Sequence, residues 1–161
     1  GTGNTGILLE VIFVLETSGK EGVYVDRFLP NTPLRVIVNH LAEEVTESYP
    51  IGLLNKQLVP GRINDLIGNE RFVDEIFPEM LKTAEEIADQ MKNKEIDMGL
   101  QYMNQTIDHE IGRLAYLYKR NRAIRPDEIK TALEQKTELT ELIANARIRI
   151  DAIQLIREGG N

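Results

Sequence analysis

The fold is decided by one stretch, Asn121-Arg122-Ala123-Ile124-Arg125-Pro126-Asp127-Glu128, which interrupts a long pattern of helical period. Pro126 fits the first turn of a helix, where its missing N–H would have no partner anyway. Asp127 and Glu128 suit the same helix end, because the helix dipole is positive there. The stretch therefore predicts a turn near 121–126 between two long antiparallel helices.

Apolar residues recur every three or four positions on both sides of this turn, as in amphipathic helices. Before the turn, a first stripe contains Met80, Ala84, Ile87 and Met91, and a second contains Ile96, Leu100, Met103, Ile107, Ile111, Leu114 and Tyr118. After it, the stripe comprises Ile129, Leu133, Leu139, Ile143, Ala146, Ile150 and Ile153. We expect helices over 69–157, with Asn69 as the N-cap and Pro78 restarting or kinking the first helix. The two arms would span about 60 Å and about 45 Å at a helical rise of about 1.5 Å per residue.

Residues 7–38 carry the period of two that is typical of β-strands. The first run places on one face Ile7, Leu9, Val11, Phe13 and Leu15. Turn-forming residues separate it from a second run at 23–29, and prolines separate that run from a third at 34–38. Connections this short force antiparallel neighbours. We therefore expect a three-stranded β-meander at 7–38, followed by an irregular covering segment at 39–68.

Together these patterns predict an α+β fold in a single domain, 1–161, in which a small antiparallel sheet precedes a long antiparallel helical hairpin. The 161 residues are enough for one hydrophobic core, and the composition is that of an ordinary globular protein. The chain begins at Gly1 rather than at methionine, so we expect a piece of a longer protein or a processed start.

Composition also narrows the function. The net charge of -7 argues against nucleic-acid binding by the whole surface, because phosphate contacts need clustered Lys and Arg. The absence of cysteine excludes disulfides and thiolate chemistry and is compatible with a reducing cytoplasm. The longest apolar run, 7–15, is far shorter than the ~20 residues that span a membrane. We expect a cytoplasmic protein without membrane contact.

No catalytic motif is evident in the sequence. His109-Glu110-Ile111-Gly112-Arg113 begins like the helix of a zinc protease, but Arg113 stands where the second histidine is required. His109 is therefore interpreted as a polar helical residue, with a small metal-dependent enzyme as a remote alternative. The carboxylates of Glu85, Glu86 and Asp89 are interpreted as a solvated helix face. We expect no catalytic residue, no bound cofactor and no metal in this chain.

A basic segment, Arg113–Arg125, is the one local feature that departs from the acidic average, and we call it the hairpin tip. It contains five basic residues and no acidic one, which leaves 14 basic against 26 acidic residues elsewhere. The candidate contacts to phosphates or to an acidic protein surface are Arg113, Tyr118, Lys119, Arg120, Arg122 and Arg125. The alternative interpretation is that these cations only complement the dipole at a helix C-terminus and aid solubility.

Three segments match one family in order and spacing. They are Arg-Phe-Leu-Pro-Asn-Thr-Pro-Leu-Arg at 27–35, Ile-Arg-Pro-Asp-Glu-Ile at 124–129 and Arg-Ile-Asp-Ala-Ile-Gln-Leu-Ile at 149–156. The first resembles the Arg-Phe-Leu-Pro-x-Thr-Pro-x-Arg strand pair of the RapA (HepA) family of bacterial, RNA polymerase-associated, Swi/Snf-type ATPases. The second is similar to that family's Ile-Arg-Asp-Asp-Glu-Leu turn, and the third to its closing Arg-Leu-Asp-Ala-Leu-Arg-Leu-Ile.

The resemblance implies a non-catalytic C-terminal domain of such an ATPase, whose parent recycles RNA polymerase as a helicase-like, DNA-binding hydrolase. ATP and magnesium would then belong to the parent's upstream domains. The implied partners are core RNA polymerase and the upstream ATPase domains of the same chain, and a nucleic-acid contact is compatible with it. The alternative is a structural or oligomerisation module without a direct ligand. Exposed apolar positions on both faces of the first helix, such as Ile96 and Leu100 beside Met91 and Met98, would favour it.

Overall fold

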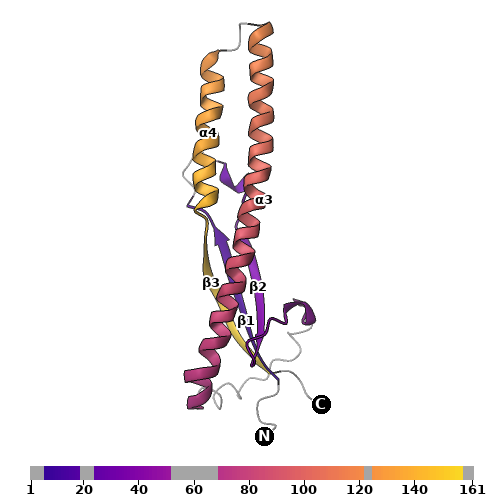
Figure 1. The fold of residues 1–161 in the computed structure, drawn as a ribbon, viewed down its shortest axis with the longest axis vertical. Coiled ribbons are helices and arrows are strands. Elements are labelled where there is room, and N and C mark those ends of the chain that lie inside the picture. The colour runs from indigo at the N-terminus through magenta and orange to yellow at the C-terminus, as the bar shows by residue number, and fades with distance from the viewer. Residues whose placement is uncertain (1–5, 19–23, 52–68, 122–124, 158–161) are drawn as a thin grey trace. The chain divides into compact units, whose positions relative to one another are not determined.

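The computed structural model describes four segments of the chain, namely residues 6–18, 24–51, 69–121 and 125–157 (Figure 1). The chain forms two compact units that share one long helix. The first unit consists of Gly1–Val14, Pro33–Met91 and Ile148–Asn161, and the second of Leu15–Thr32 and Lys92–Arg147. The expectation of a single domain stays a prediction.

A three-stranded antiparallel sheet lies mainly in the first unit. Its strands are β1 (Ile7–Glu16), β2 (Thr32–Asn39) and β3 (Arg147–Arg157), in the order β2-β1-β3. An ion pair links the two strands that are adjacent in sequence, with Arg35 Nε 2.8 Å from Glu10 Oε2. The α+β class with a small antiparallel sheet and a helical hairpin is therefore confirmed.

The predicted β-meander at 7–38 is wrong, because only two strands of the sheet lie in this range and the third comes from the C-terminal end of the described chain. We expected helix through Ile150 and Ile153, but α4 ends at Ala144 and β3 begins three residues later. Asn145 is the C-cap, with φ -97° and ψ 12°, and its N–H bonds the carbonyls of Glu141 and Ile143. Alternating Arg and Ile at 147–150 then give the period of two, which suits a strand.

The predicted strand at 23–29 is also wrong over the residues that the structure describes. Val25–Arg27 form a 3₁₀ turn, η1, and the N–H groups of Phe28 and Leu29 both bond the Val25 carbonyl at 2.9 Å. Val25, Phe28 and Leu29 are buried while Tyr24 is exposed. This spacing of three and four residues is that of a helical turn, and it prevails over the β-branched composition.

The long helix begins much as the sequence predicts. The Asn69 side-chain oxygen accepts the Phe72 N–H at 3.3 Å, which is N-cap geometry. A π-helical turn, η3 (Phe72–Ile76), leads directly into α3 (Phe77–Arg120), whose 44 residues span about 66 Å. In the first unit the fully buried residues of α3 are Met80, Ala84 and Ala88. The buried stripe therefore runs straight at i, i+4 and i+8, and only its first two members were predicted.

The second unit contains the helical hairpin of α3 and α4 (Pro126–Ala144), as Figure 1 shows. Its buried apolar residues include Met103, Ile107 and Leu114 on α3 and Ala132, Leu139 and Ile143 on α4. Leu133 was expected in this stripe but is 49% exposed, and Tyr118 is exposed as well. The 19 residues of α4 span about 28 Å, so the expected length of about 45 Å is wrong because the strand takes the remainder.

A glycine permits one close contact within the second unit. A Cβ built on Gly99 would lie 3.1 Å from the Phe28 carbonyl oxygen and 3.6 Å from Ile143 Cγ2. A Cβ on Gly112 would meet nothing within 4 Å. Gly99 therefore lets α3 approach the backbone next to η1, whereas Gly112 has no such role.

The segment after β2 is irregular where it is described. An isolated bridge joins Val38 to Glu44, and a 3₁₀ turn, η2, covers Thr46–Ser48. Val45 and Tyr49 pack on a cluster formed by Leu8, Ile37 and Ile156. Residues 40–51 thus cover part of the sheet, as expected for 39–68, and the remainder of that prediction falls at 52–68, outside the described residues.

Candidate functional site

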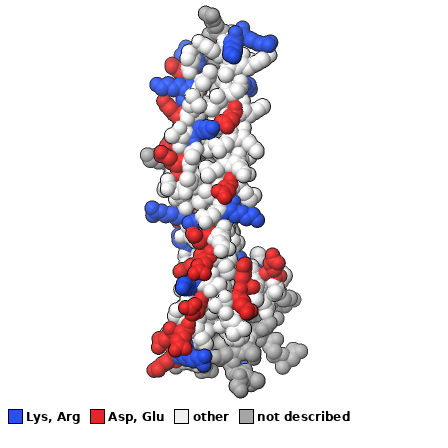
Figure 2. All heavy atoms as spheres, viewed as in Figure 1, with Lys and Arg blue, Asp and Glu red and all other residues white. Residues whose placement is uncertain are grey.

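The hairpin tip is formed by the last two turns of α3 and the residue that precedes α4. Figure 2 shows Lys and Arg side chains at this end of the hairpin. The Asn121 N–H bonds the Leu117 carbonyl at 2.7 Å, which closes the last turn of α3. Arg122 lies outside the described residues, so its placement stays a prediction.

Arg125 occupies the N-cap position of α4 in an extended conformation, with φ -78° and ψ 140°. Its carbonyl accepts the Glu128 N–H at 3.0 Å, and its side chain makes no capping hydrogen bond. Pro126 falls in the first helical turn and Asp127 follows it, as the sequence predicts. The guanidinium of Arg125 is therefore exposed at the hairpin turn.

Arg113 is neutralised by an acidic residue one turn earlier on α3. Its Nε lies 3.0 Å from Glu110 Oε2 and its Nη2 lies 2.6 Å from Glu110 Oε1, which is a bidentate ion pair. The hydrogen bond and the charge of Glu110, with a smaller effect of Glu128, raise the pKa of Arg113. The structure thus holds Arg113 in an intramolecular contact rather than presenting it to a partner.

The remaining described cations of the tip are open to contact. The Arg120 guanidinium lies 4.3 Å from the centroid of the Tyr116 ring, a cation–π geometry. Lys119 and Arg125 are exposed and make no ion pair with any residue that the structure describes. Tyr118 is exposed beside them. The tip therefore combines three available cations with two exposed aromatic rings.

The helix dipole explains only part of this arrangement. Lys119 and Arg120 lie in the last turn of α3, where cations are favourable, at about 0.3–1 kcal/mol each. Arg125 stands before the first turn of α4, where the dipole is positive and a cation is unfavourable. A contact with an external anion would account for Arg125, whereas the dipole does not.

An ion pair joins the two arms of the hairpin. Lys136 Nζ on α4 lies 2.7 Å from Asp108 Oδ1 on α3, and the two arms bury Met103 and Leu139 completely. The pairing of Glu110 with Arg113 was not predicted, although their i, i+3 spacing on a helix is a usable signal. Glu85, Glu86 and Asp89 are exposed, as predicted for a solvated helix face, and they also line a groove in the first unit.

His109 is exposed on α3. Among the residues that the structure describes, no group of three His, Cys, Asp or Glu side chains could hold a metal ion. No described helix combines the length and the apolar character needed to cross a membrane.

Comparison with known proteins points to one family. Residues 2–157 match the sequence profile of the family described as "RNA polymerase recycling family C-terminal". The chain is similar to the RNA polymerase-associated protein RapA of Actinobacillus succinogenes, at 29% identity over 150 residues. It is also similar to the proteins of that name from Pasteurella multocida, at 27% over 150 residues, and Vibrio campbellii, at 27% over 152 residues. Each alignment covers 93% of this chain and 16% of the relative's length.

Proposed function

We propose that the chain, which belongs to the C-terminal domain family of the RNA polymerase recycling proteins, is a non-catalytic accessory domain of a bacterial, ATP-dependent translocase. This translocase would associate with RNA polymerase and recycle it. The family match over residues 2–157 carries this proposal. The chain spans only 16% of the relatives' length. ATP, magnesium, DNA binding and hydrolysis would accordingly be handled by other parts of the parent protein, in the bacterial cytoplasm.

The proposed contact surface is the hairpin tip. Lys119, Arg120 and Arg125 are available there, and the dipole accounts poorly for Arg125. Their proposed target is an acidic surface of core RNA polymerase or of the parent's ATPase domains. The exposed rings of Tyr116 and Tyr118 add apolar contact area, and tyrosine and arginine are enriched at protein interfaces. Binding through phosphates of nucleic acid is the competing outcome, and it would show a steeper salt dependence.

Two assays of the isolated chain test the accessory role, namely ATP hydrolysis and co-sedimentation with core RNA polymerase. We expect no ATP turnover above the buffer rate, with or without DNA, and co-sedimentation with core RNA polymerase at low salt. ATP hydrolysis that co-purifies with the chain through two orthogonal columns would contradict a non-catalytic role. Failure to co-sediment, in turn, would leave the ATPase domains as the remaining partner, and their separately expressed fragment would then be assayed in the same way.

An oligomerisation module without a direct ligand is the second candidate. One observation favours it, because Met98 is 55% exposed on α3. Ile96, however, is buried within the second unit, so the apolar surface available for self-association is smaller than the sequence suggested. Sedimentation velocity over a hundredfold concentration range separates the two candidates, since the accessory domain remains a monomer and an oligomerisation module does not.

A further inference from the structure

We propose that a groove beside α3 in the first unit binds a basic, extended segment of a partner protein. The groove encloses about 540 Å³. Its floor is formed by Phe13, Ile148 and Ile150, and its wall by Lys82, Glu85, Glu86 and Asp89. It belongs to the first unit, whereas the hairpin tip belongs to the second, and the proposal does not depend on the proposed function of the tip.

The floor of this acidic groove is apolar and incompletely covered. Ile150 is 40% exposed and Ile148, two residues earlier on the same strand, is only partly buried. β3 stands at the edge of the sheet and pairs with β1 only, as far as the structure describes the chain. An edge strand of 11 residues that exposes apolar side chains is commonly covered by another segment in folded proteins. An added segment would remove these apolar side chains from water.

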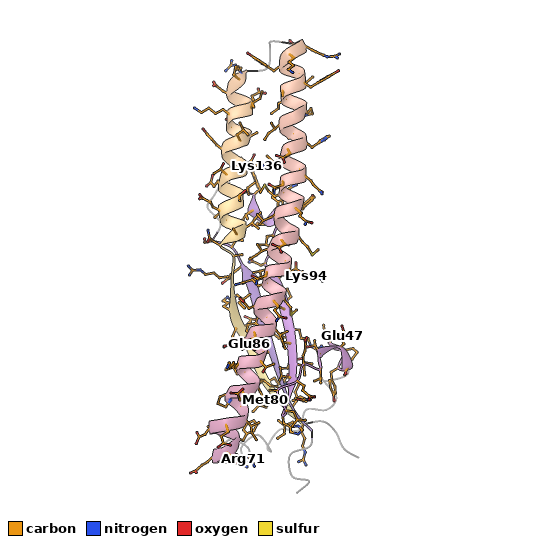
Figure 3. All side chains as sticks on the ribbon, viewed as in Figure 1. Glu47, Arg71, Met80, Glu86, Lys94 and Lys136 are labelled. Carbon is orange, nitrogen blue, oxygen red and sulfur yellow. The ribbon has the colours of Figure 1, made fainter. Side chains whose placement is uncertain are left out.

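The wall of the groove sets the charge of the occupant. Two of its carboxylates, those of Glu85 and Glu86, make no ion pair with any described residue. From Glu70 to Met91 the chain carries seven acidic and two basic residues. Figure 2 shows acidic side chains gathered over this stretch, and Figure 3 labels Glu86 within it. The resulting negative field favours a partner rich in Lys or Arg.

The geometry favours an extended peptide over a small ligand. Ile148 and Ile150 are two residues apart on a strand, so their side chains share a face and repeat every ~7 Å, which is the side-chain repeat of an extended partner. Glu85, Glu86 and Asp89 occupy about one turn of α3 above them. A segment that alternates apolar and basic residues would place its apolar side chains on β3 and its cations against the carboxylates. Such a segment would lie on the face of β3 beside α3, because a strand added at the edge of the sheet would turn its alternate side chains to the opposite face, away from the carboxylates.

The test uses the whole chain and two synthetic, fluorescently labelled octapeptides, one alternating Lys and Ile and one alternating Glu and Ile. We expect the basic peptide to bind at low salt with at least tenfold higher affinity than the acidic one, measured by fluorescence anisotropy. Replacement of both Glu85 and Glu86 by Lys should weaken this binding about tenfold, since two exposed opposite-charge contacts become repulsive. The matched control, Glu134→Lys with Glu138→Lys on α4, makes the same change in net charge and should weaken it less than threefold.

Methyl NMR of the isoleucines locates the peptide independently of the variants. Shifts confined to Ile148 and Ile150 support the groove, whereas shifts at Ile143, in the other unit, contradict it. Equal affinity for both peptides, or an equal loss in the control pair, would overturn the proposal. So would self-association of the chain that is abolished by the Glu85 and Glu86 replacements, because the groove would then hold a second copy.

Discussion

The guanidinium carbon of Arg120 lies 4.3 Å from the centroid of the Tyr116 ring, one turn earlier on the same helix. The contact restrains a long, flexible side chain at the free end of a hairpin. Arginine otherwise loses much of its rotamer freedom on binding, so a cation already held in place binds an anionic partner at a lower entropic cost. Tyr116 is thus a positioning residue for the proposed contact surface.

This contact predicts a measurable coupling between the two side chains. In a double-mutant cycle with Tyr116→Ala and Arg120→Ala, the free energies of urea unfolding should differ from additivity by about 0.5 kcal/mol. Tyr116→Phe keeps the aromatic face and should retain most of that coupling. Additive effects within error would show that the two residues do not interact in solution.

The two glycines of α3 should respond in opposite ways to alanine. Gly112→Ala should raise the free energy of unfolding by about 0.5–1 kcal/mol, because alanine is the better helix former and nothing opposes its methyl group. Gly99→Ala places that methyl 3.1 Å from the Phe28 carbonyl oxygen. The free energy of unfolding of Gly99→Ala should therefore be lower than that of Gly112→Ala by at least about 1 kcal/mol. Equal stabilisation by both replacements would contradict the packing of η1 on α3.

The buried stripe of α4 can be tested by one matched pair of leucines. Leu139→Ala should lower the free energy of unfolding by about 2–5 kcal/mol, since Leu139 is fully buried between the arms. Leu133→Ala should cost less than about 1 kcal/mol, because that side chain is half exposed. Chemical denaturation of the two variants decides the matter, and the reverse ranking would restore the stripe predicted from the sequence.

The pair of Glu110 and Arg113 makes a prediction about pH. The hydrogen bond from Arg113 lowers the pKa of Glu110 below its ordinary value of 4.5. A lowered carboxyl pKa stabilises the fold at neutral pH, and that contribution is lost as pH falls below 4.5 through the folded-state value. Carboxyl NMR should show the Glu110 pKa below 4.5, and returning toward 4.5 in Arg113→Ala. An unshifted titration in the wild-type chain would refute the bidentate pair.

Local signals in the sequence predicted where the two helical arms begin. Pro126 with Asp127 placed the start of α4, and Asn69 placed the N-cap before η3. Both predictions rest on groups within one helical turn, where the unpaired N–H groups of a helix end impose strong residue preferences. The antiparallel hairpin followed from them, because the stripes on either side of the turn require a partner.

Non-local pairing was the part that the sequence could not reveal. Ile150 and Ile153 fit a helical stripe, and Arg147 to Ile150 fit a strand, so periodicity alone did not decide between them. The pairing partner of β3 is β1, more than a hundred residues earlier, and no local pattern identifies it. The acidic groove could not be predicted for the same reason, since Phe13 and Ile148 on the sheet and Glu86 on α3 come together only in the folded chain.

The central claim is that the hairpin tip contacts an acidic partner, and a titration of the labelled chain with core RNA polymerase tests it most directly. Arg120→Glu with Arg125→Glu should weaken binding about tenfold or more at low salt, because two attractive contacts become repulsive. Lys94→Glu with Arg157→Glu makes the same change in net charge at exposed residues elsewhere and should change the affinity less than threefold. Equal affinities for the two double variants, with both chains folded by circular dichroism, would contradict the account.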